Sequence, residues 1–195
     1  MRSASIIRQT AETNIKLQLD LDSSADVAVN TGVGFLDHML TLFAHHGRFG
    51  LNIQAQGDTH VDDHHLVEDV GICLGQAFAQ AMGDMRGITR YGNIVLPMDE
   101  ALVLCAVDIC GRSTLRCYLD LPSAKVGSFD TELVEEFLLG FTRNARLSLH
   151  LRQLDGSNTH HIIEACFKAL GRVMRAAVNI DPLAQGSIPS TKGAL

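Results

Sequence analysis

The sequence lacks several features that would place it in particular protein classes. It has no excess of basic residues, because 16 Lys and Arg against 22 Asp and Glu give a net charge of −6. General binders of nucleic acid or of anionic membranes need a concentrated basic face, so the composition argues against both classes and leaves only local basic pockets. The chain also has no run of about 18 consecutive apolar residues, as a membrane span requires, and no N-terminal signal pattern. We expect a soluble, cytoplasmic protein.

Paired cysteine motifs are absent as well. The chain has five cysteines, an odd number, with apolar neighbours and without CxxC spacing (Cys73, Cys105, Cys110, Cys117 and Cys166). This pattern indicates reduced, buried thiols rather than a disulfide framework. A chain of 195 residues with 46% hydrophobic content can bury roughly 70% of its extended-chain surface. We therefore expect a compact unit that folds without such cross-links.

Hydrophobic periodicity predicts the same order of elements twice: strands, helix, strand, helix. In the first round, residues 14–22 alternate between polar and apolar side chains, as a half-buried strand does, and residues 27–30 form a short partner strand. Apolar residues at three- and four-residue spacing then predict a helix from Phe35 to Gly47. A strand over 51–55 and a longer helix from about Asp62 to Gly83 complete this round.

The second round occupies most of the remaining chain. Its predicted elements are a β-hairpin of residues 101–109 and 114–121 around the turn 111–113, a helix over 130–143, a strand over 147–151 and a helix over 159–178. We therefore expect an α+β fold of two tandem duplicated halves, residues 1–93 and 94–182. Their helices should pack together in a central layer between two outer β-sheets. Residues 183–195 follow as a tail, in which residues 186–193 match no helix or strand period and by composition alone would be a frayed terminus.

A short pattern of potential metal ligands occurs twice in the chain. His64-His65-x-x-Glu68 returns 96 residues later as His160-His161-x-x-Glu164, on the corresponding predicted helix. Positions four apart share one face of a helix, so the first histidine and the glutamate of each copy can bind one ion together. The second histidine of each copy projects about 100° round the helix. Adjacent histidines that point in two directions suit two metal centres, or a site that another subunit completes.

Each copy has a further candidate ligand on or near the preceding predicted helix. His38 lies 26 residues before His64, and Glu136 lies 24 residues before His160. Imidazole and carboxylate without thiolate suit Mn²⁺, Fe²⁺ or Zn²⁺, and the share of oxygen ligands favours manganese. A single HHxxE would more often be a pair of surface histidines, but two copies on corresponding helices favour ligands. A ferritin-like di-metal bundle is disfavoured because strands separate these helices.

Longer segments surround these residues. They are GFLDHM at 34–39, GDTHVDDHH continuing to Glu68-Asp69 at 57–69, SNTHHIIE continuing to Lys168 at 157–168, and IPSTKG at 188–193. Together they resemble the imidazoleglycerol-phosphate dehydratase family of histidine biosynthesis, over essentially the whole chain. The resemblance implies a lyase that converts D-erythro-imidazole glycerol phosphate to imidazole acetol phosphate and water, with two Mn²⁺ per active site. It also implies a large homo-oligomer of octahedral symmetry, with active sites between subunits.

The resemblance also implies roles for individual residues. Implied metal ligands are His38, His64, His65, Glu68, His160, His161 and Glu164, with Glu136 at an eighth position that often holds histidine in the family. Implied phosphate and substrate contacts are Arg90, Arg112, Lys168, Ser190, Thr191 and Lys192, joined by His38, His46, His64 and His160. Glu12 is the implied general acid or base beside the substrate, with Glu68 or Glu164 as less favoured bases. The tail 183–195 would then cover the substrate.

The implied reaction explains why two metal centres would be useful. The substrate loses a hydroxyl from the carbon attached to its imidazole ring, and a proton from the next carbon, which no carbonyl activates. A ring that bridges two metal ions through its nitrogens could become an imidazolate and push out the hydroxyl, and the neighbouring proton would then be acidic enough to remove.

Two other classes of function fit part of the sequence. A non-catalytic metal-storage shell would use the same ligands, but it needs no phosphate-binding tail. A metallohydrolase acting on a phosphoester would also use them, but it would release inorganic phosphate, whereas a dehydratase retains the phosphate on its product.

Overall fold

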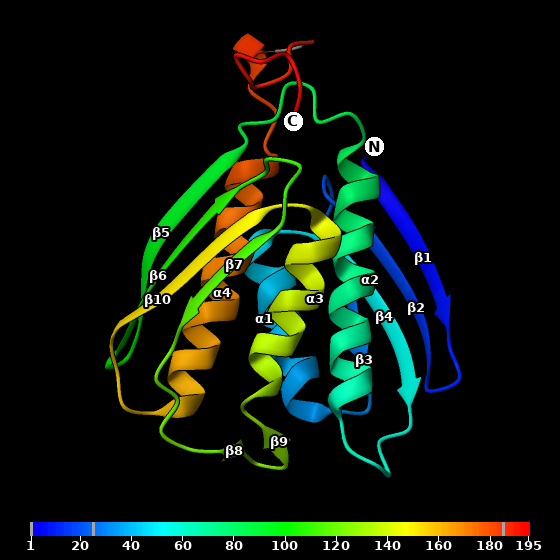
Figure 1. Cartoon of the computed structure of the whole chain (residues 1–195), viewed down its shortest axis with the longest axis vertical. Helices are drawn as coiled ribbons and strands as arrows, with labels where there is room; N and C mark the ends of the chain where they lie inside the picture. The colour runs from blue at the N-terminus through cyan, green and yellow to red at the C-terminus, as the bar shows by residue number, and fades with distance from the viewer. Residues whose placement is uncertain (1, 25, 185) are drawn as a thin grey trace.

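The computed structural model describes residues 2–24, 26–184 and 186–195. Among these residues, two four-stranded sheets lie on opposite sides of a layer of helices (Figure 1). The predicted α+β fold, with helices in a central layer between two outer sheets, is confirmed. No helix in this part of the chain is long and apolar enough to cross a membrane.

The elements follow the predicted order with four additional strands, two at the edges of the four-stranded sheets and two in a separate two-stranded sheet. The first half contains β1 (Ser3–Gln9), β2 (Thr13–Asp20), β3 (Val27–Asn30), α1 (Gly34–Gly47), β4 (Gly50–Gly57) and α2 (His64–Met82). The second half contains β5 (Tyr91–Met98), β6 (Ala101–Asp108), β7 (Thr114–Tyr118), β8 (Lys125–Val126), β9 (Phe129–Asp130), α3 (Leu133–Ala145), β10 (Ser148–Asp155) and α4 (Thr159–Val178). A 3₁₀ turn, η1 (Pro182–Ala184), leads into the tail.

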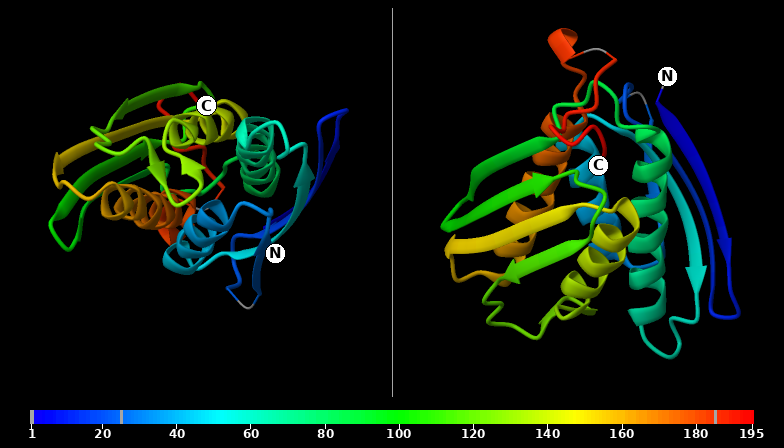
Figure 2. Two further views of the ribbon diagram at one scale, coloured as in Figure 1. Left: turned by 90° about the horizontal axis from the view of Figure 1, so that it is seen from below. Right: turned by 45° about the horizontal axis from the view of Figure 1, so that its top comes forward.

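The two halves share one topology. The strand order is β1-β2-β4-β3 in the first sheet and β5-β6-β10-β7 in the second. In each sheet one edge strand, β3 or β7, pairs in parallel with its neighbour, whereas the other pairs are antiparallel. Each helix of one half packs against a helix of the other half: α1 packs against α4, and α2 packs against α3 (Figure 2). The boundaries 1–93 and 94–182 stay a prediction.

Glycines at equivalent positions, 96 residues apart, let these helix pairs approach closely. Gly75 in α2 lies against the backbone carbonyl of Phe141 in α3, and Gly171 in α4 lies against the carbonyl of Phe43 in α1. A Cβ atom at either glycine would collide with these backbone atoms. The close approach of α1 and α4 allows side chains of both helices to reach one point.

Alternating apolar side chains fill the space between each sheet and the helices. In β2, Ile15, Leu17 and Leu19 are buried, whereas Lys16 and Gln18 between them are exposed, as the sequence alternation predicts. At the centre, aromatic rings pack with centroid separations from 5.2 to 6.5 Å (Phe43, Phe49, Phe78 and Phe141). All five cysteines are free, and all but the half-buried Cys117 are buried.

The predicted hairpin of residues 101–109 and 114–121 is wrong. β6 pairs with β5 and β10, and β7 pairs in parallel with β10, so β10 lies between the two predicted partners. The buried residues Leu149 and Leu151 of β10 suit this central position. A turn signal describes only a local reversal of the chain, and it carries no information about a strand that arrives some thirty residues later.

The edge strands β1 and β5 are absent from the sequence prediction. In β5, Gly92 and Pro97 obscure the alternation. An edge strand tolerates proline because one row of its N–H groups has no strand partner. Gly92 is needed where β5 crosses α4, because a Cβ there would collide with the backbone of Val173. In β1, the exposed Ile7 interrupts the expected polar outer face.

Candidate metal centre

Three donor side chains meet between α1 and α4. They are His38 from α1 with His160 and Glu164 from α4, and their ligand atoms all lie within 4.8 Å of one another. Nε2 of His160 is 3.1 Å from Oε2 of Glu164, and Nε2 of His38 is 3.5 Å from the same oxygen. Two imidazole nitrogens and a carboxylate oxygen at one point form a donor set that fits a divalent ion such as Mn²⁺, Fe²⁺ or Zn²⁺.

The start of α4 fixes the position of His160. The side-chain oxygen of Asn158 accepts hydrogen bonds from the backbone N–H groups of His160 (2.9 Å) and His161 (3.3 Å), which caps the helix. The ring of Phe35 in α1 packs edge-on against the His160 ring, with centroids 5.2 Å apart. Glu164 follows one helical turn later on the same face, so the spacing in the sequence produces the pairing seen in the structure.

Lys168 adjoins this group one turn further along α4. Its Nζ lies 2.5 Å from Oε1 of Glu164, and its side chain is largely buried. Burial alone would raise the pKa of Glu164, which is only 7% exposed. The hydrogen bond and charge of Lys168, with the hydrogen bond from His160, outweigh burial and hold that pKa below its usual value. Glu164 is therefore an anion at neutral pH, as a metal ligand must be.

The second histidine of each HHxxE copy lies outside the three-residue group and has its own carboxylate partner. Nδ1 of His65 is 3.1 Å from Oδ2 of Asp58 and 3.9 Å from Oε2 of Glu12. Nδ1 of His161 is 2.7 Å from Oε2 of Glu100. These partners raise the pKa values of both histidines. Hydrogen bonds from His161 and from the backbone N–H of Asn158 lower the pKa of Glu100 to about 2.

Asp58 and Glu100 contact the two histidines, and neither residue is predicted from the sequence. Asp58 lies in the segment 57–69 that carries the family resemblance, so its position was a usable signal. Glu100 lies on the β5–β6 turn, 61 residues before its partner, and β5 itself is not predicted. Nothing local in the sequence indicates that contact.

The predicted ligands of the other helix pair do not form a comparable group. His64 and Glu68 lie on α2, and Glu136 lies on the neighbouring helix α3. Within the described residues, only the group of His38, His160 and Glu164 brings three donor atoms together. The structure therefore brings together three of the eight predicted ligands, and the other five lie on α2, α3 and α4 outside this group.

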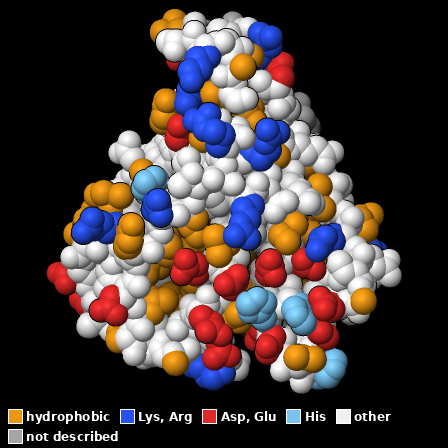
Figure 3. Space-filling model, viewed as in Figure 1, with side chains coloured by type: hydrophobic (Ala, Val, Ile, Leu, Met, Phe, Trp, Pro, Cys, Tyr) orange, Lys and Arg blue, Asp and Glu red, His pale blue; other side chains and the backbone are white. Residues whose placement is uncertain are grey.

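Most of the predicted phosphate contacts lie at the opposite end of α4. Arg90 donates to Asp108 (2.7 Å) and to the carbonyl of Pro189 in the tail (2.9 Å), and its backbone N–H donates to the carbonyl of Ala177. Gly111, beside Arg112, lies against Leu195. Ala177 is seventeen residues after His160, which places this end roughly 25 Å along the helix from the metal ligands. In Figure 3 most of the visible histidines lie among carboxylates toward the lower end, and several Lys and Arg side chains gather toward the tail end.

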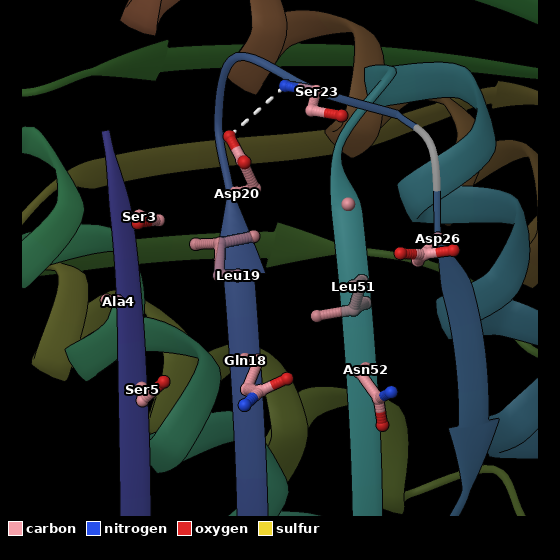
Figure 4. A pocket seen from close by; sticks show the side chains of 11 residues that line it. Ser3, Ala4, Ser5, Gln18, Leu19, Asp20, Ser23, Asp26, Leu51 and Asn52 are labelled. Carbon is pink, nitrogen blue, oxygen red and sulfur yellow. Dashed lines mark hydrogen bonds between the residues drawn. The ribbon is translucent and has the colours of Figure 1, made fainter. Parts of the chain in front are cut away.

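Two of the hollows in the described part of the chain are lined by polar or charged side chains outside the three-residue group. One, of about 600 Å³, is lined by His46, Arg48, Arg172 and Arg175 among others. Burial, with the nearby charges of Lys168 and Arg172, lowers the pKa of His46, so this is a local basic pocket of the kind the composition leaves open. The other lies on the first sheet beside polar side chains such as Gln18 and Asn52 (Figure 4). None of the predicted metal ligands lines this second hollow.

Comparison with known proteins identifies the family. The sequence model described as "Imidazoleglycerol-phosphate dehydratase" matches residues 31–174. The chain is 57% identical over 195 residues to the imidazoleglycerol-phosphate dehydratase of Xanthobacter autotrophicus, covering 100% of this chain and 99% of that protein. It is 55% identical over 195 residues to that of Methylorubrum extorquens, covering 100% of both chains.

Solved structures agree with the sequence comparisons. The crystal structure of imidazoleglycerol-phosphate dehydratase from Staphylococcus aureus is similar with a TM-score of 0.84 and 44% identity, over 92% of this chain and 99% of that one. The structure of the enzyme from Pyrococcus furiosus, in complex with (S)-C348, gives a TM-score of 0.85 and 37% identity, over 97% and 100% of the two chains. The chain therefore belongs to the imidazoleglycerol-phosphate dehydratase family, the hydro-lyases of histidine biosynthesis.

Proposed function

We propose that this hydro-lyase dehydrates D-erythro-imidazole glycerol phosphate while it holds the substrate's imidazole ring between two Mn²⁺ sites. The observation that carries the proposal is the convergence of His38, His160 and Glu164 on one point. Bound Mn²⁺ would supply Lewis acidity that favours the imidazolate form of the ring. The residues that would hold the two ions are His38, His64, His65, Glu68, Glu136, His160, His161 and Glu164.

The proposed general acid or base is Glu12, on the turn between β1 and β2. A network anchors this turn to α2, because the hydroxyl of Thr13 donates to Oδ2 of Asp69 (2.5 Å) and the guanidinium of Arg8 donates to Oδ1 (2.8 Å). Asp69 is buried and follows the proposed ligand Glu68 directly. The carboxylate of Glu12 thus stays close to His65 while it remains half exposed. It can therefore remove a proton from the substrate carbon or deliver one to the departing hydroxyl.

The substrate's phosphate needs fixed positive charge at a distance from the ring. Lys168 lies beside the metal ligands and can donate to a substrate whose ring lies there. The other proposed phosphate contacts are Arg90, Arg112, Ser190, Thr191 and Lys192, with His46 near Lys168. Arginine offers bidentate geometry to phosphate that lysine does not.

The separation of these groups supports a site shared between subunits. The substrate, a ring with a three-carbon chain and a phosphate, is far shorter than the roughly 25 Å between the two ends of α4. One copy of the chain therefore cannot place its own metal ligands and its own tail on one substrate molecule. We propose that the tail end of one subunit completes the metal end of another, in a large homo-oligomer of octahedral symmetry.

The proposed function is tested by removing and restoring the metal. Exhaustive chelation is expected to abolish dehydration, and added Mn²⁺ should restore it, with the phosphate retained on the product. Chromatography of the reaction mixture, with a parallel assay for inorganic phosphate, gives both readouts. Full dehydration by the metal-free protein would refute the metal mechanism, and release of inorganic phosphate would favour a phosphoester hydrolase.

Replacing cations at the tail end should weaken substrate binding and leave metal binding intact. We expect Arg112→Ala and Lys192→Ala each to raise KM by roughly 10-fold or more, because a hydrogen bond to a charged group is worth about 1.5–3 kcal/mol. Steady-state kinetics and metal analysis of the same preparations check this. Arg152→Ala, an exposed arginine on β10, is the control and should leave KM unchanged. Loss of bound metal in the two test variants would contradict their assignment to phosphate.

A further inference from the structure

Two carboxylates hold histidines that are proposed metal ligands. Asp58 reaches Nδ1 of His65 with both oxygens, at 3.2 and 3.1 Å. Glu100 reaches Nδ1 of His161 with Oε2, at 2.7 Å. An ionised carboxylate can only accept hydrogen bonds, so Nδ1 of each ring must carry the proton. In the neutral ring the lone pair then lies on Nε2, the nitrogen that can bind a metal ion. Nε2 of His161 has Oδ2 of Asp99 3.7 Å away, beyond hydrogen-bond distance.

Glu100 is fixed in place by the backbone of the segment that leads into α4. Its Oε1 accepts hydrogen bonds from the N–H groups of Ser157 (3.2 Å) and Asn158 (2.8 Å), while Oε2 faces His161. The side chain of Asn158 in turn caps the helix at His160 and His161. The β5–β6 turn is therefore tied to the first turn of α4, and the orientation of the His161 ring is set by three hydrogen bonds to one carboxylate.

Asp58 occupies a comparably constrained place after β4. Its backbone N–H donates to the carbonyl of Glu12 (3.1 Å), and its carbonyl accepts from the N–H of Val61 (2.8 Å). The Asp58 side chain is about one-fifth exposed, so it lies largely packed beside the more exposed His65 ring. The backbone of Asp58 is thus held on both sides, and both carboxylate oxygens face Nδ1 of His65 in the orientation of the ring seen here.

The two carboxylates come from different places in the duplicated halves. Asp58 lies between β4 and α2, whereas Glu100 lies on the turn between β5 and β6. The residue 96 positions after Asp58 is Leu154, which cannot accept a hydrogen bond from an imidazole. A carboxylate therefore contacts Nδ1 in both halves, from Asp58 in the first and from Glu100 in the second. The β1–β2 turn, which corresponds to the turn of Glu100, carries Glu12, and its Oε2 is farther from Nδ1 of His65, at 3.9 Å.

We propose that Asp58 and Glu100 are positioning residues that fix the Nδ1–H form of His65 and His161 and so present Nε2 of both rings to Mn²⁺. This inference rests on the proposed function, because it needs both histidines to be ligands. Partners of this kind orient metal-ligating histidines and raise the basicity of the ligand nitrogen, and their loss typically weakens metal binding about 10–100-fold.

The test is a Mn²⁺ titration of the full-length, assembled protein in competition with a chelator. Asp58→Ala and Glu100→Ala are each expected to weaken the binding of Mn²⁺ about 10–100-fold. Asp58→Asn and Glu100→Gln keep the shape of the side chain and an acceptor oxygen, so we expect smaller losses. Asp155→Ala removes an exposed carboxylate on β10 that accepts a hydrogen bond from the neighbouring backbone N–H of Gly156 and should leave the affinity unchanged. Unchanged affinity in the two alanine variants would overturn the inference.

A double variant separates positioning of the ligand from a general structural role. If Glu100 acts through His161, Glu100→Ala combined with His161→Ala should bind Mn²⁺ no more weakly than His161→Ala alone. Additive losses would overturn the inference, because they would show that Glu100 acts elsewhere, for example through the start of α4. If His161→Ala itself leaves Mn²⁺ binding unchanged, the proposed metal site and this inference both fail. If His161→Ala weakens binding and Glu100→Ala does not, only this inference fails.

Discussion

Glu164→Gln is expected to lower kcat by more than about 100-fold, because loss of an outer partner of a metal ligand alone costs about 10–100-fold and Glu164 is itself a proposed ligand. Its Oε2 lies within 3.5 Å of both His38 and His160, so it is the common member of the donor group. The neutral amide of glutamine is a weaker ligand for a hard cation. Bound Mn²⁺ should fall in parallel with kcat, as metal analysis of the purified variant would show.

A matched substitution distinguishes the loss of a ligand from the loss of a charge. Glu135→Gln removes a carboxylate from the exposed side of α3, outside the donor group, and should leave both kcat and metal content unchanged. Glu164→Gln also removes the partner of Lys168, so the stability of the metal-free variant does not by itself report the loss of a ligand. Because the variant lacks a proposed ligand, Mn²⁺ should raise the thermal midpoint of the wild type more than that of the variant. A Glu164→Gln protein with full activity and full metal content would show that the three residues do not bind the functional ion.

Co-expression of two defective variants is expected to restore activity that neither variant has alone. Glu164→Gln damages the metal end, and the double variant Arg112→Ala, Lys192→Ala damages the tail end. In randomly mixed assemblies, up to about a quarter of sites would combine an intact metal end with an intact tail end from different copies. The expected result is a corresponding fraction of wild-type activity, measured at a substrate concentration below KM.

The control for this experiment is a mixture of the two variants assembled separately. It should show only the residual activity of each variant, because no site combines their intact ends. If co-expression gives no more activity than this mixture, each site is built within one copy of the chain. That result would contradict the proposal of shared sites, which we infer from the separation of roughly 25 Å along α4.

The duplicated architecture could be predicted because its signals are local and repeated. The alternation in β2 and the three- and four-residue spacing in α1 each reflect the surface that a single element buries. The constant offset of 96 residues between the HHxxE copies shows that two helices correspond. The i, i+4 spacing predicts that His160 and Glu164 share one helix face, and the structure shows them in contact.

The remaining features depend on contacts between distant segments. The crossing of α1 onto α4 brings His38 to the site, and no local pattern specifies which helices pair. The position of β10 between β6 and β7 is non-local for the same reason. Glu100 could not be identified because its turn belongs to β5, a strand whose Gly92 and Pro97 hide its period. Glu136 in place of the family's frequent histidine stays a predicted ligand.

The most direct test of the central claim is anomalous scattering at the manganese edge from crystals of the Mn²⁺-loaded protein. We expect two peaks per active site, one of them about 2 Å from ligand atoms of His38, His160 and Glu164. Nε2, and not Nδ1, of His65 and His161 should face a peak. Crystals of active protein with no peak at the His38, His160 and Glu164 group would contradict it.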